Sequence, residues 1–103
     1  MDNLKIVYKI LSEIDKQMDN EIFDESFTKD LKVSDVRIGK IVESLLEDGY
    51  LAGIKISKSK TGNIIMYIEP RLTIEGMMFL QENSIMQKIK NGLKDVKDIT
   101  PFI

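Results

Sequence analysis

The stretch that decides the fold is Glu43–Ile54, ESLLEDGYLAGI. An amphipathic run ends at Gly49, which suits the position just after a helix because a glycine backbone readily takes a positive φ. Tyr50 and Leu51 come next and can fold back onto the core. The chain then becomes basic, at Lys55, Lys58 and Lys60. The stretch therefore predicts a helix that ends at Gly49, a following segment that Tyr50 and Leu51 hold against the core, and a basic segment after it.

Two short β-prone segments follow, over residues 54–56 and 64–68, on either side of the polar loop SKSKTGN. Gly62 lies near the middle of this region, where it can take the backbone twist of a hairpin tip. Pro70 is expected to end the second strand because it has no N–H to donate to a ladder. A two-stranded hairpin is not stable alone in water, so we expect it to lie against helices.

Three helices are predicted before the hairpin. The first is Leu4–Met18, with apolar residues at spacings of three and four, namely Leu4, Val7, Tyr8, Leu11, Ile14 and Met18. Residues 24–32 predict a short second helix with Phe27 and Leu31 on one side. Ser34 is expected to cap the third. The buried stripe expected for this third helix is Ile38, Ile41, Val42, Leu45 and Leu46.

Helical periodicity resumes after the hairpin, over Leu72–Gln81 with Thr73 as a cap. Ser84 is predicted to cap a separate last helix. We expect a single winged-helix domain over residues 1–97 and a C-terminal tail over residues 98–103. The order of elements is that of a mainly α protein with a β-hairpin (α+β), a winged helix-turn-helix with extra C-terminal helices.

The composition argues against several classes of function. The 103 residues include no cysteine and no histidine, so thiolate and imidazole chemistry are absent. There is no glycine-rich phosphate loop, and the acidic residues of Asp19–Asp30 do not match a calcium-binding loop. We therefore expect no enzymatic activity, no cofactor and no metal site. With no apolar run long enough for a bilayer and no signal layout, we expect no membrane partner and a cytoplasmic location.

Three segments resemble the YjcQ family, small proteins found largely in bacteriophages and prophages. They are LKIVYKIL, ESLLEDGYLAGIKI and PRLTIEGMMFLQENSIM. Together they cover the chain from Leu4 to about Lys90, and LTIEGMMFLQEN, directly after the hairpin, is the most specific part. The resemblance implies a winged-helix fold and a bacterial host cell, and it brings no catalytic motif with it.

The expected nucleic-acid interface lies on the third helix and the hairpin. In helix-turn-helix proteins the second helix of the motif enters the major groove, and lysines and hydroxyls suit phosphate contacts. The candidate DNA-binding residues are Ser34, Arg37, Lys40, Ser44, Lys55, Lys58, Lys60 and Arg71. The acidic residues of the third helix, Asp35, Glu43, Glu47 and Asp48, count against this interface because they repel phosphate. A solvated helix face and lysines that protect a strand edge are the simpler interpretation.

Two functions from different classes stay open. The first is binding of double-stranded DNA, with a role as a transcriptional regulator. The second is a protein-interaction module that binds no DNA and docks a protein partner through the hairpin or the last helix. A homodimer through the C-terminal helix is a further alternative, since Phe102 and Ile103 would be exposed in a monomer. The net charge of −2 does not decide, but DNA binding needs the cations on one surface with the acids elsewhere.

Overall fold

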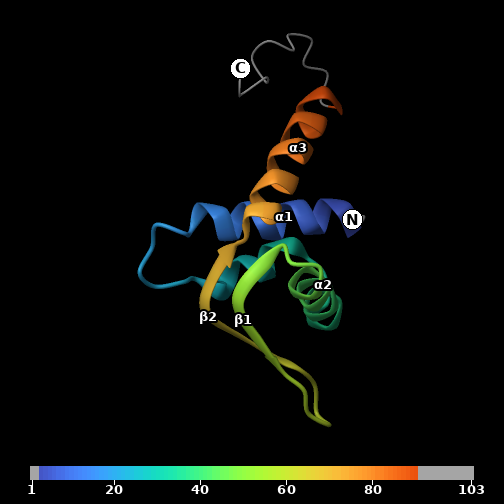
Figure 1. Ribbon diagram of the computed structural model, residues 1–103. Coiled ribbons are helices and arrows are strands. Elements are labelled where there is room, and N and C mark those ends of the chain that lie inside the picture. Colours follow the sequence, from blue (N-terminus) through green and yellow to red (C-terminus); the bar gives the residue numbers. More distant parts are fainter. Residues whose placement is uncertain (1–2, 91–103) are drawn as a thin grey trace.

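The computed structural model of the protein describes residues 3–90 (Figure 1). The elements in order are α1 (Asn3–Lys16), η1 (Glu25–Leu31), α2 (Asp35–Glu47), β1 (Leu51–Ser57), β2 (Ile64–Leu72) and α3 (Ile74–Lys90). This is a mixed α+β arrangement of four helices and one antiparallel hairpin, compatible with a winged-helix layout. The hairpin and α3 leave the body of the molecule in opposite directions (Figure 1). The predicted tail, residues 98–103, lies outside the described residues.

The core lies between α1, η1, α2 and the base of the hairpin. From α1 it takes four fully buried side chains, Ile6, Ile10, Leu11 and Ile14. The predicted stripe of α1 is therefore partly wrong, because Leu4 is 67% exposed and Met18 is exposed as well. Two neighbouring rows on this helix both have spacings of three and four. The row of β-branched isoleucines is the one that packs inward.

A buried glutamine fixes the connection from α1 to η1. The Gln17 side chain donates to the Asp24 carbonyl at 3.0 Å and accepts from the Asp24 N–H at 2.7 Å. The Asp24 carboxylate in turn accepts from the Ser26 N–H at 2.9 Å and caps η1. The hydrogen bonds from Ser26 lower the pKa of Asp24 below its usual value. The short second helix predicted over residues 24–32 is thus confirmed, as a 3-10 helix.

The turn from η1 into α2 spans residues 32–34. The Ser34 hydroxyl accepts from the Arg37 N–H at 3.2 Å, which confirms the predicted cap. The predicted stripe of α2 is also confirmed, since Ile38, Val42 and Leu45 are buried while Ile41 and Leu46 are half-buried.

Gly49 ends α2 as predicted. Its φ is +81°, and its N–H bonds to the Leu46 carbonyl at 3.2 Å. The next N–H, from Tyr50, reaches back to the Leu45 carbonyl at 2.8 Å. This pair of bonds is the Schellman motif, which satisfies carbonyls that the helix end would leave free. Leu51 then enters the core as the first residue of β1.

The hairpin contains a bulge close to its base. Ala52 pairs with Arg71 and Ile54 pairs with Tyr67, so Gly53 alone faces three residues of β2. The excess of two residues on one strand breaks the ladder locally and bends the hairpin.

Pro70 lies in this bulge, inside β2, so the prediction that it ends the strand is wrong. A residue in a bulge does not need to donate to the ladder, and proline is tolerated there. Across from it, Gly53 has a φ of +77°. A Cβ at Gly53 would lie 1.8 Å from the Glu69 carbonyl oxygen, so only glycine fits this bend.

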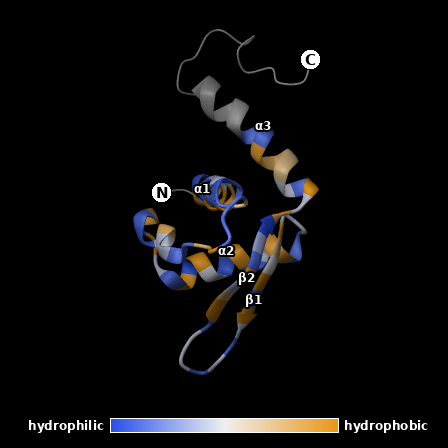
Figure 2. Cartoon of the chain, turned by 90° about the vertical axis from the view of Figure 1, so that its left-hand side faces the viewer, coloured by the Kyte–Doolittle hydropathy of each residue, from blue (hydrophilic) through white to orange (hydrophobic). Residues whose placement is uncertain are grey.

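Beyond the bulge the hairpin has an inner and an outer face. Ile54, Ile56, Ile65 and Tyr67 point inward, and Tyr67 stacks on Phe23 with ring centroids 4.9 Å apart. The outer face carries Lys55, Ser57, Ile64, Met66 and Ile68. In Figure 2, hydrophobic residues, coloured orange, continue along both strands below the helices.

α3 starts where the hairpin returns to the body. The Thr73 hydroxyl accepts from the Gly76 N–H at 3.0 Å, which confirms the predicted cap, and the Thr73 N–H bonds to the Tyr50 carbonyl at 3.1 Å. The helix then runs unbroken to Lys90, so the prediction of a separate helix starting at Ser84 is wrong. Serine is only mildly unfavourable inside a helix, and the single glycine of α3, Gly76, lies in its first turn, far from Ser84. None of the described helices is both long and apolar enough to cross a membrane.

Candidate nucleic-acid interface

All eight candidate side chains are exposed, but they fall into three groups. Ser34, Arg37, Lys40 and Ser44 lie on α2, the three lysines lie on the hairpin arm, and Arg71 lies at the hairpin base. The structure does not gather them onto one surface.

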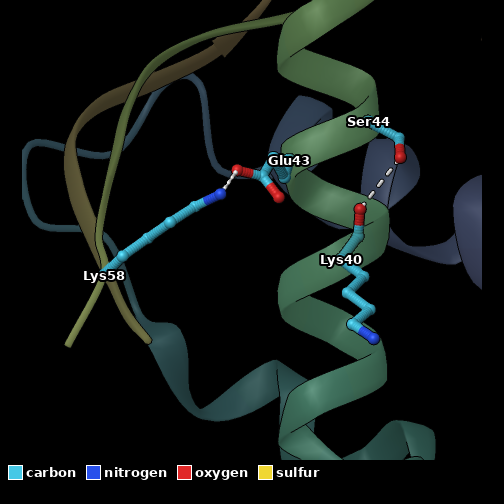
Figure 3. Close-up of polar contacts among 4 residues, drawn as sticks. All are labelled: Lys40, Glu43, Ser44 and Lys58. Atoms are coloured by element: carbon cyan, nitrogen blue, oxygen red, sulfur yellow. Dashed lines mark hydrogen bonds and ion pairs between the residues drawn. The ribbon is translucent and has the colours of Figure 1, made fainter. Parts of the chain in front are cut away.

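The α2 group is exposed, and Lys40 also borders a cleft between α2 and the hairpin tip. The Arg37 guanidinium donates to the Asn3 side-chain oxygen at 2.9 Å, so a neutral group of α1 holds it. The Ser44 hydroxyl donates to the Lys40 carbonyl at 3.0 Å. Figure 3 shows Lys40 and Ser44 pointing away from the hairpin. Among residues 3–90, the Lys40 ammonium has no ion-pair partner.

The hairpin lysines differ in their surroundings. Lys58 Nζ lies 2.8 Å from the Glu43 carboxylate of α2 (Figure 3). This hydrogen bond and the charge of Glu43 raise the pKa of Lys58, and Glu47 adds to the effect. Lys55 and Lys60, in contrast, make no ion pair within the part of the chain that the structure describes.

The hydroxyl groups of the hairpin tip are used within the tip. The Ser59 hydroxyl donates to the Gly62 carbonyl at 2.5 Å and lies 3.2 Å from the Thr61 hydroxyl. At the opposite end of the hairpin, Arg71 donates to the Glu69 carbonyl at 3.2 Å, with the Glu69 carboxylate 3.9 Å away. A carboxylate thus accompanies one cation at each end of the hairpin.

A cleft of about 580 Å³ separates the first half of α2 from η1 and the hairpin. Ile38, Gly39, Ile65 and Tyr67 are among its lining residues, together with the charged side chains Glu25, Asp35 and Lys40. Burial raises the pKa of Tyr67 to about 12, and Glu25 contributes to the shift. Two carboxylates beside one ammonium make this cleft a poor site for phosphate.

Gly39 lines this cleft but was not among the residues predicted from the sequence. A Cβ at this position would meet only the Ile65 side chain, 4.0 Å away, so no neighbour forbids a larger residue. The available signal was a glycine in the middle of an amphipathic helix, where it lowers helix stability relative to alanine. Its effect is to leave the cleft wider than an alanine would.

The chemistry of these surfaces is that of binding. Among residues 3–90, no three carboxylates come together in a group that could hold a metal ion. Exposed cations and hydroxyls on α2 can contact phosphates or base edges, and the apolar outer face of the hairpin can contact another apolar surface.

Comparison with known proteins gives one match. A family model described as YjcQ protein matches residues 8–99, which is nearly the whole chain. No curated protein and no solved structure matches the chain.

Proposed function

The chain belongs to the YjcQ family, and from this premise we propose that it is a phage- or prophage-derived winged helix-turn-helix protein that binds double-stranded DNA. A role as a transcriptional regulator in the bacterial cytoplasm fits such an activity. The proposal rests chiefly on one observation. Arg37, Lys40 and Ser44 are exposed on α2, and the Lys40 and Ser44 side chains point away from the hairpin strands (Figure 3). The order of elements and the turn over residues 32–34 support α2 as the recognition helix.

In this proposal the first half of α2 lies in the major groove. Arg37 exchanges the neutral Asn3 acceptor for guanine, or for a phosphate, whose bond to the guanidinium joins two opposite charges and is stronger. Val36, exposed beside it, can contact a thymine methyl group. Lys40 and Ser44 reach the backbone one and two turns further along.

The hairpin lysines would then contact the flanking backbone. Lys60 makes no described ion pair, so it can bind phosphate directly, whereas Lys55 lies on the outer face of the hairpin, away from α2. Lys58 must first leave Glu43, and phosphate has to compete with that carboxylate. Glu25 and Asp35 line the cleft that Val36 and Lys40 also border, so their charges would repel phosphate from its interior and restrict the orientation of the DNA on α2.

The test is a fluorescence anisotropy titration of a labelled mixed-sequence duplex at about 50 mM and 200 mM salt. We expect binding that weakens steeply between these two conditions. Lys40→Glu should weaken it and reduce the salt slope by about one unit or more, since it removes a phosphate contact. Lys9→Glu, the same change on an exposed site of α1, is the matched control. No binding at the lower salt, or equal losses in the two variants, would refute the proposal.

A second candidate is the protein-interaction module without DNA binding. It is favoured by the carboxylates beside Lys58 and Arg71 and by the apolar outer face of the hairpin. If the wild-type protein does not bind DNA at low salt, this second function is the better supported of the two.

A further inference from the structure

The outer face of β2 is an uncovered apolar stripe. Ile64, Met66 and Ile68 are 61%, 39% and 65% exposed. Together with the inward Ile65 and Tyr67 they form IIMYI, five residues without a charge, four of them β-prone. Proteins usually protect an exposed strand edge with charges or prolines, and on β2 these begin only after Ile68, at Glu69 and Pro70. The edge over residues 64–68 is therefore a template for another strand.

The free edge of β2 also has an empty groove beside it. Its volume is about 560 Å³, and it lies between residues 17–23 and residues 67–71 of β2. Both the inward Tyr67 and the outward Ile68 line it, which places it along the edge of the strand. Within the described residues, the backbone of 64–70 bonds only to β1, apart from the Arg71 bond to Glu69. An additional strand has space here and, except at Pro70, which has no N–H, free backbone groups to pair with.

We propose that β2 of a second copy of this chain fills the groove, in an antiparallel pair about a two-fold axis at Met66. Such a pair places Ile64 of each copy opposite Ile68 of the other, and Met66 opposite Met66. The stripe is thus self-complementary, as a two-fold interface requires. Residues 61–65 of each copy run along residues 67–71 of the other, which is where the groove lies.

Charge complementarity supports the same orientation. The antiparallel pair brings the hairpin tip of one copy, with Lys60, to the groove of the other. Two carboxylates, Glu21 and Glu69, and one cation, Arg71, line that groove. A lysine therefore meets a net negative site, twice by symmetry. A parallel pair would instead put the two basic tips together.

Light scattering during size-exclusion chromatography, from about 1 to 100 µM protein, tests the proposal. We expect a mass of about twice 11.8 kDa at the higher concentrations. Met66→Lys places two like charges opposite each other on the axis, so this variant should elute as a monomer with unchanged circular dichroism. Met78→Lys, on an exposed site of α3, is the matched control and should leave the dimer intact. A monomeric wild type, or loss of the dimer in Met78→Lys only, would overturn the proposal.

Cross-linking tests the register without depending on how a lysine is tolerated. The chain has no cysteine, so Met66→Cys introduces a single thiol on the axis. Directly opposite residues of an antiparallel pair have Cα atoms about 4.5–5.5 Å apart, within the reach of a disulfide. We expect mild oxidation to convert Met66→Cys to a covalent dimer and to leave Met78→Cys largely monomeric. Equal yields from the two variants would contradict the register. Neither measurement contains DNA, so failure of DNA binding would leave this inference untouched.

Discussion

Replacing Gly53 by alanine probes the bend in the hairpin. The φ of +77° is unfavourable for an L-residue by about 1–2 kcal/mol. The new Cβ would also lie 1.8 Å from the Glu69 carbonyl oxygen and 2.9 Å from the Arg71 guanidinium. Relief of this overlap requires movement of the bulge and loss of the bond from Arg71 to Glu69, which adds about 0.5–1.5 kcal/mol or more. We expect a total loss of about 2–4 kcal/mol in the free energy of unfolding.

Urea denaturation followed by circular dichroism measures this loss, and a Tm lower by roughly 10 °C or more should accompany it. Gly62→Ala is the control, because Gly62 also has a positive φ, +128°, but no atom within 4 Å of its would-be Cβ. It should lose only the backbone term. Equal destabilisation by the two variants, within about 0.5 kcal/mol, would refute the steric reasoning about the bulge.

Four further outcomes are expected. Gly39→Ala should stabilise the protein by about 0.5–1 kcal/mol in thermal unfolding, because alanine loses less conformational freedom than glycine on folding and its Cβ would meet only one side chain, at 4.0 Å. A loss of stability would show that the cleft is already filled. Gln17→Leu should destabilise by about 2–3 kcal/mol in urea, because it removes the bonds that satisfy two backbone groups of the following loop; a neutral result would mean that water replaces the amide. Burial raises the pKa of Tyr67 to about 12 from 10.0, so unfolded chains lose this proton first and stability should fall as the pH rises through that interval. Tyr67→Phe should be less sensitive to pH there, and an unchanged pH dependence would argue against the shift. Glu43→Gln should lower the Lys58 pKa, read by NMR titration, and strengthen DNA binding; weaker binding would show that the ion pair positions the lysine productively.

The sequence was informative where one or two neighbouring residues decide the local structure. Ser34 and Gly49 begin and end α2 as predicted because a cap needs only a side-chain acceptor or a positive φ within the same turn. Pro70 and Ser84 were misread because their effects depend on the surroundings. A bulge makes the proline harmless, and a continuous helix outweighs the mild preference of serine for a cap.

The sequence identified which residues of the candidate site would be exposed, but it did not show which contacts they make. The exposure of all eight candidates follows from their polarity, but the pairing of Lys58 with Glu43 joins two elements and could not be read from spacing. The same holds for the buried Gln17, since a polar residue after a helix normally lies in solvent. The apolar outer stripe could not be read from alternation, because Ile64–Ile68 are all apolar, and which face stays open depends on the packing of Tyr67.

The length of the hairpin tip is separate from the packing of the body. Leu51 and Leu72 anchor the base in the core, Tyr67 and the inward isoleucines beyond the bend still pack against the body, and only the tip projects away from it (Figure 1). Residues added in pairs around Gly62, one to each strand, would extend the ladder by about 3.4 Å per pair without changing any register below them. The arm therefore acts as an adjustable spacer, and small insertions at its tip could retune its reach while the helices stay as they are.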